Sequence, residues 1–297
     1  MRLDDEQESS NIEDRRGKRG GGGFRFPGGG GRRVRMGGKR GGMGIGTIIL
    51  LLIGMFVFGV NPLEFLGGGS GGGSVQAPQT RNAPPPTSAQ QDAMKTFVSK
   101  VLKTTETTWQ KKFAEQGKQY REPRLVLFSG SVRSACGQAQ SAMGPFYCPG
   151  DQKIYIDMSF FRDMETRMQA GGDFAWAYVV AHEVGHHIQT LLGISGKVSA
   201  ARQRVSKVES NRLSVRMELQ ADCMAGMWAN DNKRILEQGD IEEGLNAASA
   251  IGDDRLQRRS GGRIVPESFT HGTSAQRVEW FKRGFQTGSL AACNTFK

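Results

Sequence analysis

The chain of 297 residues lacks several features that define large protein classes. Only one long apolar run is present, within the uncharged residues 41–63, which excludes a membrane protein with several spans. The four cysteines are too few for a domain built mainly on disulfides, and none are spaced C-x-x-C as in many zinc sites. Apolar residues make up a low 37%, and most of the 42 glycines precede residue 75. The chain therefore combines a biased N-terminal segment with a folded remainder.

The N-terminal third divides by composition into three parts. Residues 1–42 are polar and then rich in Gly, Arg and Lys, so we predict a disordered basic tail. Residues 43–63 are apolar and long enough for one transmembrane helix, and residues 64–90 form a Gly/Ser/Pro linker. A cleaved signal peptide is the alternative, but its apolar core is shorter and no A-x-A-like site follows Val60.

Charge on the two sides of this stretch predicts an orientation. Six basic residues and no acid lie between residues 25 and 40, whereas residues 61–80 contain one Glu and no Lys or Arg. We therefore predict a cytoplasmic N-terminus near anionic lipid and an extracytoplasmic domain. The Arg-Gly-Gly runs also resemble nucleic-acid-binding segments, an alternative that we favour less because the position beside the span already accounts for them.

Residues 91–297 are predicted to form an α+β domain. Apolar spacing indicates helices over residues 91–116, 174–192, about 203–230, 240–258 and 275–286. Residues 124–128 are typical of a strand, and residues 144–157 of a hairpin that turns at Pro149, Gly150 and Asp151.

The four cysteines permit three disulfide pairings. In an oxidising compartment the simplest choice joins Cys136 to Cys148 across a short loop and leaves Cys223 to join Cys293. Free buried thiols are the alternative, and they would indicate a reducing compartment.

The segment His182-Glu183-Val-Gly-His186 predicts a metal site. On a helix, His182 and His186 lie one turn apart on one face, so both imidazoles can bind one Zn²⁺. Glu183 is placed to act on water at the open coordination position. Gly185 permits close approach of another element. The adjacent His187 points to a different face than His186, and we expect it either to support the metal ligands or to have a structural role. A structural zinc or ordinary core histidines are the alternatives.

A catalytic zinc needs a third protein ligand. In peptidases whose motif continues as H-x-x-G-x-x-H, a third histidine would stand at residue 192. Leu192 is there, so that class is excluded. Glu218 is the candidate, because it lies among apolar neighbours on a predicted helix and a buried acid needs a partner. Asp222, one turn later, can accept a hydrogen bond from a ligand imidazole. The alternative is that both are surface acids.

Two further residues are candidates for catalysis and its support. His271 is the one histidine outside the motif region, and it can donate to the oxyanion of a tetrahedral intermediate. Arg277 can pair with Asp222 or Glu218. The alternatives are an ordinary loop histidine and a surface arginine.

Three motifs in order, HEVGHHIQ, ELQADCMAGMW and FTHGTSAQRVEWFKRGF, resemble the neutral zinc metallopeptidase family of bacteria, the YpfJ-like proteins. The resemblance covers the whole chain. It implies a bacterial membrane-anchored protein with a zincin-like fold of the gluzincin type, in which Glu is the third ligand.

A wider likeness links the chain to HtpX-type peptidases, which share H-E-x-x-H, E-x-x-x-D and a Thr-His segment followed by Arg. It implies Glu218 as ligand, Asp222 as its support, and His271 with Arg277 near the substrate oxyanion. Gly272 replaces the Pro of that pattern. The likeness also places residues 144–157 as the edge that binds the substrate backbone.

The sequence thus predicts a zinc-dependent peptidase that acts on peptides or proteins through water activated by Glu183. A zinc-bearing but inactive domain that binds a partner at the membrane is the first alternative. Nucleic-acid binding through the tail is the second.

Overall fold

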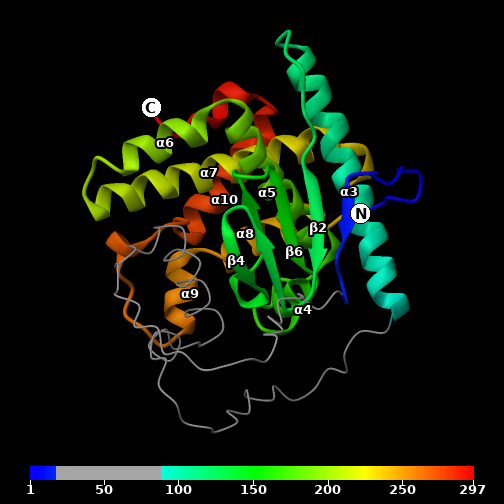
Figure 1. The fold of residues 1–297 in the computed structure, drawn as a ribbon, viewed down its shortest axis with the longest axis horizontal. Helices are drawn as coiled ribbons and strands as arrows, with labels where there is room; N and C mark the ends of the chain where they lie inside the picture. Colours follow the sequence, from blue (N-terminus) through cyan, green and yellow to red (C-terminus); the bar gives the residue numbers. More distant parts are fainter. Residues whose placement is uncertain (18–87) are drawn as a thin grey trace, which may run out of the picture.

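A computed structural model describes residues 1–17 and 88–297 and shows a mixed α+β domain (Figure 1). Its helices are α3 Ser88–Ala114, α4 Ser159–Thr166, α5 Asp173–Leu191, α6 Ile194–Arg202, α7 Lys207–Asp231, α8 Asp240–Ala250, α9 Asp253–Arg259 and α10 Ser274–Thr287. Its strands are β1 Ile12–Asp14, β2 Arg124–Phe128, β3 Ser131–Ser134, β4 Gly137–Gln140, β5 Phe146–Cys148 and β6 Lys153–Asp157.

Four strands form one sheet in the order β1-β2-β6-β5. β1 and β6 both run parallel to β2, whereas β5 returns antiparallel to β6 as the predicted hairpin. β3 and β4 pair separately as a second hairpin. β5 therefore lies at an edge of the four-stranded sheet, and it contacts α5.

Three helices pack backbone against backbone because glycines stand at their crossings. A Cβ on Gly185 of α5 would lie 3.0 Å from Ala221 of α7, so the predicted close approach at this glycine is confirmed. Between α7 and α10 the fit is tighter: a Cβ on Gly284 would lie 1.8 Å from the carbonyl oxygen of Cys223. Any larger residue at position 284 would therefore push α10 away from α7.

The predicted helices and strands are present, with shifted ends and some divisions. The helix predicted over about residues 203–230 is α7, and the sequence does not predict the short helix α6 that precedes it. The region 240–258, predicted as one helix, is divided into α8 and α9, with Gly252 between them. At Gly252 the start of α10 approaches too closely for a side chain, since a Cβ on Gly252 would lie 2.4 Å from the amide nitrogen of Ser274.

The prediction for the first residues is wrong. The composition of residues 1–17 predicts part of a disordered tail, but β1 pairs with β2 and the side chain of Leu3 is 7% exposed in the core. In Figure 1 this segment (blue) lies beside α3 and β2. Ser9 donates its hydroxyl proton to Glu106 of α3, and Lys153 of β6 pairs with Glu13 at 2.8 Å. Residues 1–17 are thus part of the domain.

This packing also corrects the predicted orientation. A single crossing at residues 43–63 would place residues 1–17 and the domain on opposite sides of a membrane, yet the two are packed together. The predicted span, the linker up to residue 87 and the basic residues 18–42 lie outside the described residues. Among the helices that are described, none combines the length and apolarity needed to cross a bilayer.

Both predicted disulfides are present. Cys136 bonds to Cys148 and so ties the turn between β3 and β4 to the edge strand β5. Cys223 bonds to Cys293 and so ties the middle of α7 to the C-terminal end of the chain. The described part of the chain contains no free cysteine.

Candidate metal centre

The helix α5 presents the two motif histidines on one face. The ring centroids of His182 and His186 lie 4.8 Å apart, and the rings are perpendicular. The helix is buried along most of its length, so neither imidazole is free to turn far from this arrangement. The local spacing of the motif therefore produces the pair of donors that it predicts.

Glu218 of α7 completes the group. One carboxylate oxygen lies 3.2 Å from Nε2 of His182, and the other lies 3.5 Å from Nε2 of His186. One ligand atom from each of the three residues lies within 4.8 Å of the others. Two imidazole nitrogens and one carboxylate oxygen are donors that zinc takes. The structure thus contains a candidate His/His/Glu metal site.

Asp222, one turn after Glu218, fixes the ring of His182. Its carboxylate accepts a hydrogen bond from Nδ1 of His182 at 2.8 Å and one from the hydroxyl of Tyr178. Asp222 therefore holds Nδ1, and Nε2 is the nitrogen that faces Glu218 and is available to a metal ion. Burial disfavours the charged ring, but Asp222 outweighs it and raises the pKa of His182 to about 9.

Arg277 of α10 compensates the buried charge of Asp222. Its Nε and Nη2 donate to the two carboxylate oxygens at 2.8 Å each, and its side chain is 2% exposed. Burial opposes ionisation of Asp222, but Arg277 lowers the pKa of the carboxyl. Of the two acids that the sequence offers as partners of Arg277, Asp222 is the one it contacts. The guanidinium also donates to the hydroxyl of Tyr178 and lies 3.4 Å from Nδ1 of His182, so Arg277 supports this histidine both directly and through Asp222.

Gln189 orients the second histidine. Its side-chain oxygen accepts from Nδ1 of His186 at 2.9 Å, which leaves Nε2 of His186 facing Glu218. The amide nitrogen of Gln189 donates to the backbone oxygen of Met217 on α7 at 2.7 Å. Both imidazoles are therefore oriented with Nε2 toward Glu218, where a metal ion would bind.

Glu183 lies beside the three candidate ligands and is 7% exposed. Burial raises the pKa of its carboxyl, although the nearby histidines oppose the rise. A carboxylate whose proton affinity is raised in this way is suited to accept a proton and to release it again near neutral pH.

His271 is held by Asp253, the first residue of α9. The carboxylate of Asp253 accepts the backbone N–H groups of Thr270 and His271 at 2.7 Å and that of Gly272 at 3.1 Å. Nδ1 of His271 also lies 3.1 Å from this carboxylate. Burial disfavours the charged ring, but Asp253 and then Glu218 raise the pKa of His271.

His187 connects α5 to the edge of the sheet. Its Nε2 donates to the backbone oxygen of Arg121 at 2.6 Å, so its Nδ1 accepts from the hydroxyl of Tyr147 on β5 at 3.1 Å. Burial lowers the pKa of His187 to about 4, so the ring is neutral. The structural role predicted for His187 agrees with these contacts.

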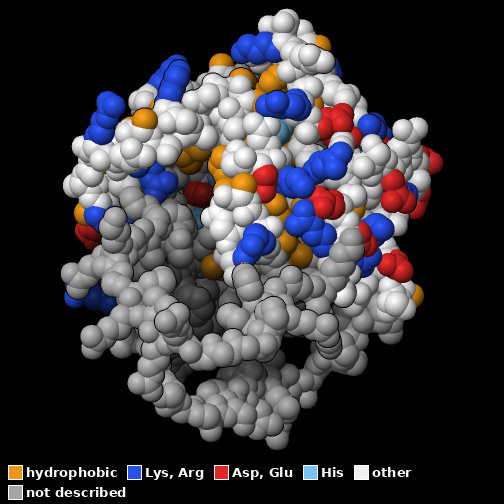
Figure 2. Space-filling view, viewed as in Figure 1, with side chains coloured by type: hydrophobic (Ala, Val, Ile, Leu, Met, Phe, Trp, Pro, Cys, Tyr) orange, Lys and Arg blue, Asp and Glu red, His pale blue; other side chains and the backbone are white. Residues whose placement is uncertain are grey.

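The candidate site lies on a hollowed face of the domain. Figure 2 shows the hollow between the α6–α7 side and the sheet side, with acidic and histidine atoms at its floor. A second group that could hold a metal, Asp173 with Asp240 and Glu243, lies elsewhere. The N-terminal ammonium of Met1 contacts Asp173 at 2.8 Å and Asp240 at 3.4 Å, so this acidic cluster already has a cation.

The chain belongs to the family described as "Putative neutral zinc metallopeptidase", whose model matches residues 1–296. Among its relatives, YpfJ of Escherichia coli K12 is 50% identical over 298 residues, covering 100% of this chain and 99% of YpfJ. The protein Mb2605 of Mycobacterium bovis is 44% identical over 190 residues, covering 60% of this chain and 63% of Mb2605. No solved structure matches the chain.

The structure groups His182, His186 and Glu218, joins Asp222 to His182 and Arg277 to Asp222, and places His271 in the loop before α10, where it contacts Asp253. Sequence reasoning missed Tyr178, Gln189 and Asp253. Tyr178 and Gln189 carried a local signal, since they lie four residues before His182 and three residues after His186 on one helix. Asp253 carried none, because 18 residues separate it from His271.

Proposed function

We propose that this chain is a peptidase that hydrolyses peptide bonds of peptide or protein substrates with one zinc ion per chain. His182, His186 and Glu218 would hold the ion. Zinc in such a site polarises the scissile carbonyl and lowers the pKa of water. The observation that carries the proposal is the convergence of these three side chains, with Nδ1 of each imidazole held by a hydrogen bond and Nε2 turned toward Glu218.

Glu183 is the general base and then the general acid. It accepts a proton from the attacking water and passes it to the leaving amine. His271 stabilises the oxyanion of the tetrahedral intermediate: its Nδ1 faces Asp253, which leaves Nε2 as the donor. Asp253 thereby positions His271, as Asp222 and Gln189 position the ligand imidazoles.

The edge strand β5 is proposed to bind the substrate backbone. It pairs with β6 along one side, and an extended peptide can add to the other side by backbone hydrogen bonds. The disulfide to Cys136 and the Tyr147–His187 hydrogen bond support this strand beside α5. These features match a zincin-like fold of the gluzincin type, which we propose for the domain.

The test compares the wild-type chain with Glu183→Gln and Glu218→Ala on a mixed peptide library, with zinc content measured in parallel. Glu183→Gln should keep zinc and lose about 100-fold or more of turnover, because the proton acceptor is gone. Glu218→Ala should lose zinc. Glu279→Gln on the exposed face of α10 is the control. Turnover retained by Glu183→Gln would remove this residue from the mechanism.

We further propose that the domain lies outside the bacterial cytoplasm, at the inner membrane, to which residues 43–63 attach it without a single crossing that would separate residues 1–17 from the domain. The two disulfides support an oxidising compartment. Since residues 1–17 pack on the domain, they share its compartment. Single cysteines introduced at the exposed residues Glu8 and Lys282 should react with an impermeant maleimide on intact spheroplasts to the same extent. Protection of one but not the other would contradict the shared compartment.

A further inference from the structure

Arg202 is the last residue of α6, where the chain turns toward α7. Its Nε donates to the hydroxyl of Ser210 on α7 at 3.1 Å. Its Nη2 is buried and has no hydrogen-bond partner. A guanidinium is charged at any physiological pH, and a buried donor of this kind without a partner is unfavourable. The side chain therefore has a capacity for an anion that the described residues do not fill.

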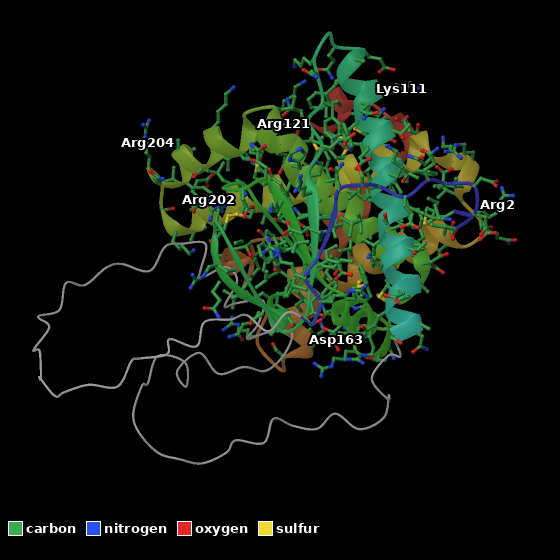
Figure 3. All side chains as sticks on the ribbon, turned by 45° about the vertical axis from the view of Figure 1, so that its right-hand side comes forward. Arg2, Lys111, Arg121, Asp163, Arg202 and Arg204 are labelled. Carbon is green, nitrogen blue, oxygen red and sulfur yellow. A yellow bond between two sulfur atoms is a disulfide. The ribbon has the colours of Figure 1, made fainter. Side chains whose placement is uncertain are left out.

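The neighbouring arginine differs. Arg204 is exposed and projects away from the domain, whereas Arg202 lies against it (Figure 3). Burial lowers the pKa of Arg202, and the charge of Glu218 is what opposes that effect. Arg202 makes no ion pair with any carboxylate in the part of the chain that the structure describes. The carboxylate of Glu218 is bonded instead to the two imidazoles.

The position of Ser210 on α7 shows where the charge of Arg202 lies relative to the candidate metal site. Ser210, Ser214 and Glu218 are spaced four residues apart, so they lie on one face of α7. Arg202 is hydrogen-bonded to Ser210, and Glu218 is part of the candidate metal site. Eight residues at 1.5 Å rise separate Ser210 from Glu218 by about 12 Å along the helix. An extended peptide covers that distance in about three to four residues.

In Figure 2, basic side chains border the hollow on the α6–α7 side. Ser210 and Ser214 are themselves only 4% and 7% exposed, so a peptide in the hollow with its scissile bond at Glu218 would pass beside this face of α7 toward Arg202. The anionic group that such a substrate carries is a carboxylate, which the fork of a guanidinium binds with two parallel hydrogen bonds.

We propose that Arg202 is a specificity residue that binds a substrate carboxylate about three to four residues from the scissile bond. The carboxylate is either the free C-terminus of a peptide or the side chain of an Asp or Glu. The inference rests on the proposed peptidase function and adds to it a class of preferred substrate, peptides with an anionic group on one side of the cut.

The experiment measures both cleavage and binding, with matched decapeptides as probes. One pair ends in a free carboxylate or an amide, and a second pair, amidated throughout, carries Glu or Gln four residues from the cut. Cleavage is measured with the wild-type chain. Binding is measured by fluorescence anisotropy with fluorescein-labelled peptides in the Glu183→Gln background, which does not depend on turnover.

We expect the carboxylate member of one pair to be favoured about tenfold or more in kcat/KM and in affinity, as a desolvated charge-assisted hydrogen bond contributes. The pair that shows the preference identifies the source of the carboxylate. Arg202→Met should remove the preference and leave cleavage of the neutral member within about twofold, whereas Arg204→Met, the matched control, should keep it. Arg202→Lys should retain part of it.

Two variants separate recognition from folding. Ser210→Ala removes the tether but keeps the charge, so the preference for a carboxylate should survive. Arg202→Gln keeps polar character if Arg202→Met proves unstable. An unchanged carboxylate preference in folded Arg202→Met or Arg202→Gln, or no preference in the wild-type chain, would overturn the proposal. Selective binding without turnover by the wild-type chain would instead overturn the peptidase function and leave Arg202 as the carboxylate site.

Discussion

Two tightly packed regions of the molecule differ in how far the sequence predicts them. One is the group of helices α5, α7 and α10, and the other is the N-terminal segment of residues 1–17. In the helices, residues one turn apart carry the chemistry, so helix periodicity alone predicts the pairs His182 with His186 and Glu218 with Asp222. The N-terminal segment is polar and mixed in charge, and only pairing with a strand about 110 residues later gives it a structure. The spacing of residues along a helix predicts which side chains act together, but it does not predict which strands pair when they are far apart in the sequence.

The largest effect in the helical region should come from Arg277→Met. The change leaves the fully buried Asp222 without its cation, so the free energy of unfolding should fall by about 3–5 kcal/mol. Urea denaturation with and without excess zinc measures the loss, and a zinc titration should show about 10–100-fold weaker binding, because His182 is no longer held. Arg283→Met, at an exposed position on α10, is the control. A loss below about 1 kcal/mol would show that Arg277 does not stabilise Asp222.

The same comparison explains how much of the site the sequence predicts. The ligand triad, its supporting Asp222 and the Arg277 pair follow from helix periodicity and from the requirement that a buried acid has a partner. Asp253 does not follow, because it reaches His271 only when α9 and the loop before α10 fold together. β1 does not follow either, since a three-residue strand without apolar alternation gives no period to detect.

In the N-terminal segment, Leu3→Ala should have the next largest effect. The side chain of Leu3 is 7% exposed in the main core, so its truncation should lower the free energy of unfolding by about 2–3 kcal/mol. Val265→Ala, where the side chain is 42% exposed, should change it by less than about 0.5 kcal/mol. Urea denaturation of both variants measures the difference. Equal, small effects would mean that the segment is not part of the domain in solution, and the predicted tail would stand.

The smallest effect is a pH dependence carried by β1. The hydrogen bond from Lys153 and the pairing with Arg15 lower the pKa of Glu13 from its usual 4.5, against the opposing effect of burial. A lowered folded pKa means that the unfolded chain binds the proton more readily. The contribution of Glu13 to stability is therefore complete above about pH 4.5 and is lost as pH falls through the folded pKa.

Glu13→Gln should consequently make the free energy of unfolding less dependent on pH between pH 6 and pH 3. The difference should be below about 1 kcal/mol, since the pair with Lys153 is partly exposed and screened by salt. Denaturation curves across this range, at low salt and at high salt, measure it, and high salt should reduce the difference. The same charge change at Glu279, on the helical region, controls for net charge. If β1 is docked, acidification breaks the ion pair between Glu13 and Lys153. An identical pH dependence in Glu13→Gln and the wild-type chain would therefore mean that this carboxylate does not hold β1.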